Sequence, residues 1–197
     1  MSESRQSAIP ASPIRPGASV LVGVMAAPDV PAVAVPQTLE RWRWLTPLAT
    51  WIPIELGEPG DAGMLCGVAA ALDRFAMAPW QLILVGEGPV AQSALELVLR
   101  GVLPCGGMIA IDISCGALPF RIVPTVTAIR LVVHHDDYEE PPSKLISAVR
   151  AADLDARIIN LNAAGCAAEA AASATETFVL ELVATIAHRT RDGAGDP

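Results

Sequence analysis

Residues 82–101, LILVGEGPVAQSALELVLRG, contain the pattern that decides the fold of this chain. Four apolar residues predict a buried strand, and the two glycines Gly86 and Gly88 predict a tight turn. From Pro89 to Arg100 the apolar residues recur with the period of a helix. A strand, a glycine turn and a helix in this order form the repeating unit of parallel sheets. The function of the unit depends on what its turn holds.

The rest of the chain contains more segments of the same two kinds. Apolar runs predict strands over 18–24, 51–56, 82–85, 108–114, 129–135 and 156–162. Pro53 indicates that the second strand lies at an edge of the sheet, because proline has no N–H to donate. Helical patterns cover 37–50, 62–76, 89–100, 142–153 and an alanine-rich segment after residue 166, and Asp61 is expected to cap the second helix. Strands that alternate with helices predict an α/β fold, with a mainly parallel central sheet and helices on both faces in a three-layer sandwich.

Length and composition favour one domain. The 197 residues are 52% hydrophobic and only 17% charged, which suits strands buried on both faces. We assign residues 1–17 to a disordered leader, 18–190 to the domain and 191–197 to a loose tail. No uninterrupted apolar run reaches the ~18 residues that span a bilayer, and the N-terminus has no signal-peptide pattern, so we expect a cytoplasmic protein.

Charge argues against polyanionic partners. The net charge is −8, and the 13 Lys and Arg are scattered, whereas nucleic acids and anionic lipids need clustered cations. Four cysteines lie far apart without a C-x-x-C pair, so we expect free, buried thiols.

In a parallel sheet, ligands bind beyond the carboxyl ends of the strands. We therefore expect a ligand-binding crevice lined by residues that end or follow the strands: Met25, Ala26, Glu87, Pro89, His134 and His135.

One interpretation of the glycine turn is a dinucleotide site. Gly86, Gly88 and Ala91 fit the spacing G-x-G-x-x-A, which lets a pyrophosphate approach the helix N-terminus. Asp112 ends the next predicted strand and could bind a ribose hydroxyl. However, such a turn usually opens the nucleotide-binding unit, and here about 80 residues precede it. Small residues for close strand–helix packing would explain the same pattern.

The order of the segments gives a second interpretation. The stretch DRFAMAPWQLILVGEGPVAQSALELVLR resembles the helix, strand, nucleophile elbow and elbow helix of the α/β-hydrolases, particularly the small carboxylesterase and acyl-protein thioesterase branch. GGMIAIDISCGALP and IRLVVHHDDYEEPPSKLISAVRAADLDARIINLN resemble the strands and acid loop that follow in this family. The resemblance covers roughly residues 18–188 and implies an α/β-hydrolase-like sandwich that hydrolyses carboxylic esters or thioesters without a cofactor.

The positions of the family's catalytic triad carry other residues in this chain. Gly88 stands where the resemblance places the serine nucleophile of the G-x-S-x-G elbow, and Cys166 stands where it places the histidine. The acid position falls on Asp137 or on Tyr138, depending on the loop length. Met25-Ala26 replaces the family's His-Gly after the first strand. We therefore expect a degenerate triad and a pseudoenzyme that acts by binding a small acyl ligand or a protein partner, a second copy of the chain being one such partner.

Two other sources of chemistry remain open. Ser114 and Cys115 follow the fourth predicted strand and are the alternative nucleophiles, whereas Ser93 on the elbow helix should face away from the site. The segment HHDDYEE offers metal ligands, but neighbouring residues of a strand point to opposite faces, so His134 and His135 cannot easily share an ion, and we expect no metal site.

Two further expectations follow from single residue types. Trp42, Trp44 and Trp51 near two arginines either form a binding surface or pack on the sheet. An elbow holds its central residue at positive φ, which glycine adopts without strain, so Gly88→Ser should destabilise the protein.

Overall fold

The computed structural model describes residues 19–25, 36–54, 56, 60–113, 117–135, 143–162 and 167–193. The strands are β1 Val20–Met25, β2 Ala49–Ile54, β3 Leu82–Glu87, β4 Gly107–Ile111, β5 Ala128–His135 and β6 Ala156–Asn162. The helices are α1 Pro36–Leu45, α2 Asp61–Phe75, α3 Gly88–Leu99, α4 Ser143–Ala151 and α5 Ala167–Gly193, with one 3-10 turn, η1, over Pro79–Gln81. All six predicted strands and all five predicted helices are present.

The strands form one sheet of six parallel strands in the order β2-β1-β3-β4-β5-β6. β1, β3 and β4 lie inside the sheet, and their side chains are buried on both faces apart from Glu87 at the end of β3. This is why they are nearly continuous runs of Val, Leu and Ile. β2 is an edge strand, which confirms the prediction from Pro53.

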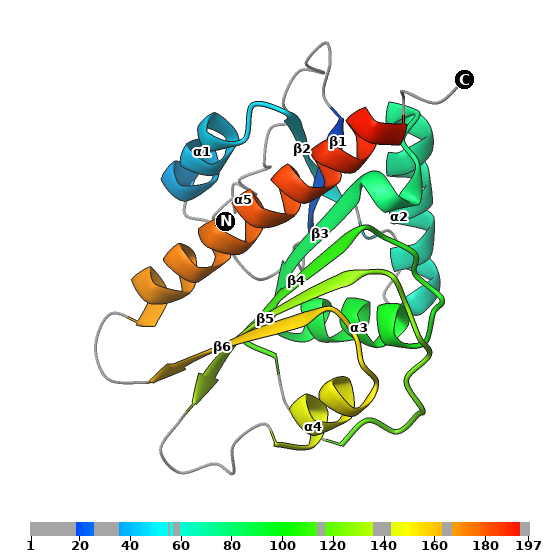
Figure 1. Cartoon of the computed structure of the whole chain (residues 1–197), viewed down its shortest axis with the longest axis vertical. Helices are drawn as coiled ribbons and strands as arrows, with labels where there is room; N and C mark the ends of the chain where they lie inside the picture. Colours follow the sequence, from blue (N-terminus) through cyan, green and yellow to red (C-terminus); the bar gives the residue numbers. More distant parts are fainter. Residues whose placement is uncertain are drawn as a thin grey trace, which may run out of the picture.

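Helices cover both faces of the sheet and give the predicted three layers (Figure 1). One face packs against α2, α3 and α4, with Met64, Leu95 and Val149 among the buried side chains of that core. The other face packs against α1 and α5, with Trp42 and Phe178 in a second core. In Figure 1 the long helix α5 crosses the sheet with α1 beside it.

Between β4 and β5 the described residues 117–127 form neither a helix nor a strand. Leu118, Phe120 and Ile122 alternate with exposed neighbours and pack against the first core. This segment therefore adds to the core on the face of the sheet that α2, α3 and α4 cover.

Three local expectations were wrong. Asp61 does not cap α2: the capping residue is Gly60, whose φ of 106° turns the chain into the helix, and no side-chain cap bond is made. Asp61 Oδ2 instead accepts a hydrogen bond of 3.2 Å from Arg100 Nη1. β4 ends at Ile111 rather than residue 114, because Asp112 leaves the extended conformation with a φ of 50°. Helix α5 continues to Gly193, beyond the predicted end of the domain at residue 190.

The tryptophans divide between the core and the surface. Trp42 and Trp51 are buried in the second core, with ring centroids 6.0 Å apart, and Trp51 Nε1 donates a 2.9 Å hydrogen bond to Thr46 Oγ1. Their packing on the sheet rules out the binding surface for these two residues. Trp44 is 77% exposed. Trp42 and Trp44 lie two residues apart on α1 and so point to opposite sides of the helix, one into the core and the other to solvent.

Candidate functional site

The connections of the sheet locate a candidate site at the carboxyl ends of β1 and β3. The chain leaves β1 toward β2 on one side, and leaves β3 toward β4 on the other, although β1 and β3 are neighbours. In open α/β sheets the crevice that binds ligands lies at such a switch point. Met25 ends β1, and Gly88 follows β3, so the elbow predicted from the sequence lies at this point.

The turn at Gly88 has the conformation of a nucleophile elbow. Gly88 has a φ of 61°, which confirms the prediction of a positive φ, and α3 begins at the same residue. A Cβ atom built on Gly88 would have no other heavy atom within 4 Å. The turn therefore has room for a nucleophilic side chain at residue 88, but glycine provides none.

Gly86 and Ala91 are small because β3 and α3 are in close contact. A Cβ on Gly86 would lie 2.8 Å from Met25 Cε and 3.3 Å from the Cβ of Ala91. Both residues are buried. Close strand–helix packing therefore accounts for two of the three residues that fit the dinucleotide pattern.

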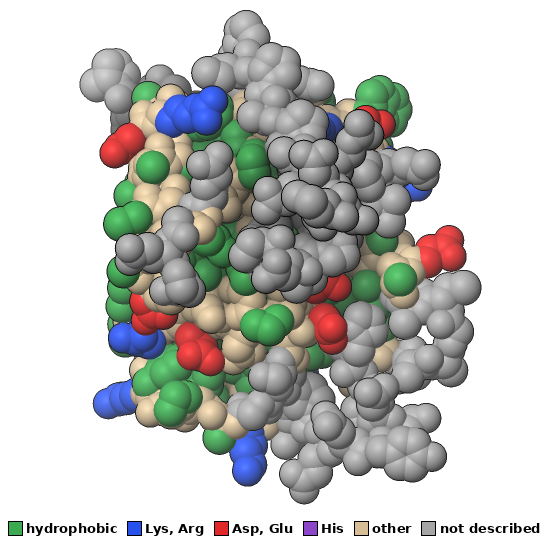
Figure 2. Space-filling model, turned by 180° about the vertical axis from the view of Figure 1, so that it is seen from behind, with side chains coloured by type: hydrophobic (Ala, Val, Ile, Leu, Met, Phe, Trp, Pro, Cys, Tyr) green, Lys and Arg blue, Asp and Glu red, His purple; other side chains and the backbone are tan. Residues whose placement is uncertain are grey.

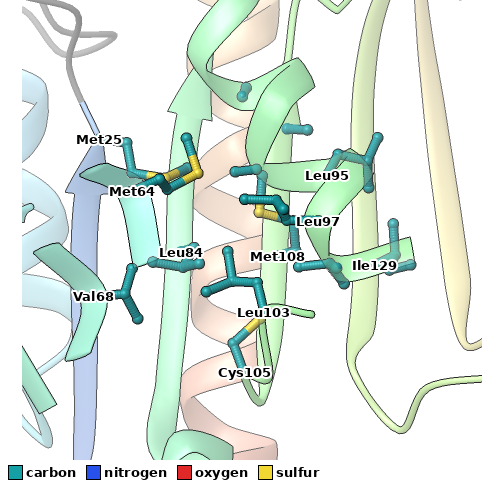
Figure 3. Close-up of a cluster of buried hydrophobic side chains, with 14 of the residues drawn as sticks. Met25, Met64, Val68, Leu84, Leu95, Leu97, Leu103, Cys105, Met108 and Ile129 are labelled. Atoms are coloured by element: carbon teal, nitrogen blue, oxygen red, sulfur yellow. The ribbon is translucent and has the colours of Figure 1, made fainter. Parts of the chain in front are cut away.

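Met25 lies in the core beneath the elbow. Its side chain is 1% exposed, and Figure 3 shows it beside Met64 of α2. This differs from the expectation that Met25 lines a crevice. Glu87 is half-buried and Pro89 is exposed, so solvent reaches the elbow at these two residues.

Pro89 deprives the elbow of one hydrogen-bond donor. In an elbow, the backbone N–H of the residue after the nucleophile is one donor of the oxyanion hole. That residue is Pro89 here, and proline has no N–H. The loss of this donor can be predicted from the sequence, because it depends only on which residue follows the nucleophile position.

The remaining predicted site residues are placed only in part. Ala26, Ser114, Cys115, Asp137, Tyr138 and Cys166 lie outside the described residues. The backbone of His134 and His135 belongs to β5, opposite Leu161 and Asn162 of β6. Ser93 is exposed, and its Oγ donates to the carbonyl oxygen of Pro89.

Asp112 lies beside the elbow. Glu87 pairs with Ile111 in the register of β3 and β4, so the next residues, Gly88 and Asp112, follow at neighbouring strand ends. Asp112 is exposed. The structure thus brings together Gly86, Gly88, Ala91 and Asp112, the four residues of the dinucleotide interpretation.

Neither of the two described cysteines is suited to act as the nucleophile of this site. Cys105 is buried near the amino ends of the strands, and burial raises the pKa of its thiol to about 12, so it stays protonated. Cys66 lies on α2 and is exposed, which contradicts the expectation that all thiols are buried. Across the described ranges no group of three His, Cys, Asp or Glu could hold a metal ion.

The surface and the longest helix agree with a packed α/β domain. On the described part of the face in Figure 2, Lys and Arg side chains stand apart from one another.

Over Ala168–Arg191, α5 is long and apolar enough to cross a membrane, judged by length and composition only. Its Phe178, Val179 and Leu182 pack in the second core, which accounts for much of this apolar character.

The sheet order, the two helical layers and the elbow define an α/β-hydrolase fold. Comparison with solved structures shows the same fold in the esterase PE8 (TM-score 0.58, 18% identity), with 88% of this chain and 100% of that chain aligned. A phospholipase/carboxylesterase from Dyadobacter fermentans is similar (TM-score 0.56, 13% identity, 88% and 96% covered), as is the Bacillus cereus carboxylesterase (TM-score 0.53, 10% identity, 83% and 88% covered). No protein-family model matches this chain, and no curated protein matches its sequence.

Proposed function

We propose that this protein keeps the α/β-hydrolase fold without serine-ester hydrolysis and acts by binding. Its ligand is a small acyl compound or a protein partner, held at the carboxyl ends of β1 and β3. The observation that carries the proposal is Gly88, which has the backbone of a nucleophile elbow and no side chain that could attack an acyl carbon. Loss of the nucleophile alone costs on the order of 10⁶ in the turnover of a serine hydrolase.

Pro89 supports the same proposal independently. Removing one donor from an oxyanion hole costs about 10²–10³ in turnover, even when the nucleophile is present. Because Pro89 lacks the N–H that an elbow uses, a serine at residue 88 would attack an acyl group whose oxyanion has lost one of its donors. The elbow therefore lacks both the attacking group and part of the stabilising group.

The experiment is hydrolysis of p-nitrophenyl butyrate by the purified protein. EstE5, a solved structure with this fold (TM-score 0.58, 12% identity), was soaked with this ester. We expect no turnover above the buffer rate for the natural protein. Gly88→Ser should also stay inactive, because Pro89 and the replaced histidine position are unchanged.

Two further variants separate the proposal from a displaced nucleophile. Turnover by the natural protein that disappears in Cys115→Ala or Ser114→Ala would contradict the proposal and identify the protein as a hydrolase with a rebuilt site. Turnover that survives in both variants would contradict it as well, with a nucleophile elsewhere in the chain.

A dinucleotide-binding module is the second candidate, because Asp112 lies beside Gly88 at neighbouring strand ends. Two features of the turn weigh against it. Glu87 is the N-cap residue of α3, and its negative charge near the start of the helix opposes the binding of a phosphate there. Pro89 removes one of the backbone amides that would donate to the phosphate.

A further inference from the structure

The outward face of α5 has an unusual distribution of charge. We define this face by the exposed residues that follow one another at helical spacing along its side away from the sheet: Glu169, Ala170, Ser173, Thr177, Leu180, Ala184, His188 and Arg191. From Ala170 to Ala184 these residues are uncharged, and the acids at the borders of the face, Glu176 and Glu181, are paired with Arg41 and Arg157. The acidic Glu169 lies at one end and the basic Arg191 at the other.

Helix α1 lies beside this face. Both helices run from the carboxyl ends toward the amino ends of the strands, so α1 and α5 are roughly parallel. Arg41 Nη2 of α1 pairs with Glu176 Oε1 of α5 at 2.9 Å. Trp44 lies about one turn beyond Arg41 on α1, and Leu180 lies about one turn beyond Glu176 on α5.

Trp44 of α1 and Leu180 of α5 are both exposed apolar side chains, at 77% and 38%. Leu180 also marks the midpoint of α5, because Glu169 and Arg191 each lie eleven residues from it. The face is thus apolar at its centre and oppositely charged at its two ends.

This pattern complements itself when a second helix runs antiparallel to the first. We propose that a second copy of this chain docks on the outward face of α5, with the two-fold axis at Leu180. Glu169 of each protomer then lies opposite Arg191 of its partner, and Trp44 covers the partner's helix. A two-fold interface uses the same patch on both protomers, as this one does.

The size of the face sets the expected strength of the dimer. A helix of 27 residues is about 40 Å long and about 10 Å wide, and the ten residues of α1 add about 15 Å. The face then buries roughly 550 Å² on each protomer, less than the roughly 800 Å² of a standard stable interface. We therefore expect a dimer that dissociates in the micromolar range.

Sedimentation velocity of the full chain, from micromolar to near-millimolar concentration, tests the proposal. The mean mass should rise from that of the monomer toward twice that value. Leu180→Arg should abolish the rise, because two like charges then meet at the axis. Val126→Arg is the matched control: Val126 is 89% exposed next to the amino end of β5, so the dimer should persist.

Charge reversal tests the antiparallel register. Glu169→Arg and Arg191→Glu should each raise the dissociation constant about tenfold, since two pairs become repulsive. The double variant should restore the natural value. Far-UV circular dichroism of every variant should match that of the natural protein.

Three results would overturn the proposal: a monomer at all concentrations, a dimer that survives Leu180→Arg, or a double variant no better than the single ones. The interface covers the helical layer of α1 and α5 and leaves the turn at Gly88 uncovered. The proposal is therefore independent of whether the elbow binds a ligand or hydrolyses an ester.

Discussion

Gly88 has a φ of 61°, and the position of its missing Cβ is open, with no heavy atom within 4 Å. The same residue therefore separates two effects that usually occur together, backbone strain and steric overlap. Side chains of L-residues rarely adopt this φ, and the strain costs about 1–2 kcal/mol. Serine in a working elbow tolerates that strain because it is the nucleophile.

We expect each substitution at residue 88 to lower the free energy of unfolding by an amount that depends on how readily the new residue adopts a positive φ, and not on the volume of its side chain. Gly88→Ser and Gly88→Ala should cost about 1 kcal/mol, and Gly88→Val should cost more because its side chain is β-branched. Gly88→Asn should cost less than Gly88→Ala, although asparagine is larger. Urea-induced unfolding measures the series, and an order that follows side-chain volume would contradict it.

Cys105 gives the stability a dependence on alkaline pH. Burial keeps its thiol protonated in the folded protein up to a pKa of about 12, whereas the exposed thiol of the unfolded chain has an ordinary pKa of 9.0. Between these values the unfolded state releases a proton that the folded state retains. The free energy of unfolding should therefore fall by about 1.4 kcal/mol per pH unit above pH 9.

The measurement is urea unfolding at two pH values above 9, in the presence of a reductant. Cys105→Ala should lose this part of the pH dependence. Cys66→Ala is the control, because the thiol of Cys66 is exposed. Equal slopes for the natural protein and Cys105→Ala would show that Cys105 ionises in the folded state.

At the scale of secondary structure, a buried arginine joins β5 to α5. The side chain of Arg130 is 3% exposed, and its Nη2 donates a 2.7 Å bond to Glu181 Oε1. Its Nη1 donates to Asp155 Oδ1 at 3.1 Å, and Glu181 also accepts from Arg157. The two acids are much more exposed than Arg130.

This difference in exposure predicts an asymmetry. Glu181→Ala leaves the buried cation of Arg130 with Asp155 as its one remaining carboxylate partner, beside two backbone carbonyls, and should cost about 3 kcal/mol. Arg130→Met leaves carboxylates that water can reach and should cost less. Arg41→Ala removes an exposed pair with Glu176 and should change stability by less than about 1 kcal/mol. Thermal unfolding of the three variants checks the order, and a larger loss for Arg130→Met than for Glu181→Ala would contradict it.

At the scale of the whole molecule, the switch point between β1 and β3 is shared by hydrolases and by nucleotide-binding sheets. The carboxylate of Glu87 and the missing N–H of Pro89 predict that nucleotides do not bind there. In a thermal-shift panel, NADH, FAD and S-adenosylmethionine should leave the melting temperature unchanged. A ligand at 100 times its dissociation constant would add about 2.7 kcal/mol, or roughly 8 °C. A shift that Asp112→Ala removes would establish the nucleotide site instead.

The fold could be predicted from the sequence because the buried faces of helices and strands need apolar residues at characteristic spacings. The strand over 156–162 has the predicted bounds, and Pro53 identified an edge, since both depend on local patterns. Asp61 could not be assigned correctly, because the φ of Gly60 decides where α2 begins. Trp42 and Trp44 lie on one short helix, and the sequence does not determine which side of that helix meets the sheet.

The candidate site was predicted less completely. The elbow and the positive φ of Gly88 follow from a strand and helix joined by a glycine turn. Met25 was misplaced because its long side chain enters the gap that Gly86 leaves, a contact between separate strands that spacing cannot show. Pro89 could have been recognised from the sequence, because a missing N–H needs no coordinates.

The two edges of the sheet also differ in their capacity to recruit a foreign strand. β2 carries Pro53, which interrupts any ladder of hydrogen bonds on its outer side. β6, with the sequence ARIINLN, has no proline, and its outer backbone groups follow one another without interruption. Aggregation by strand addition should therefore begin at β6, where Arg157 is the charged residue that opposes it.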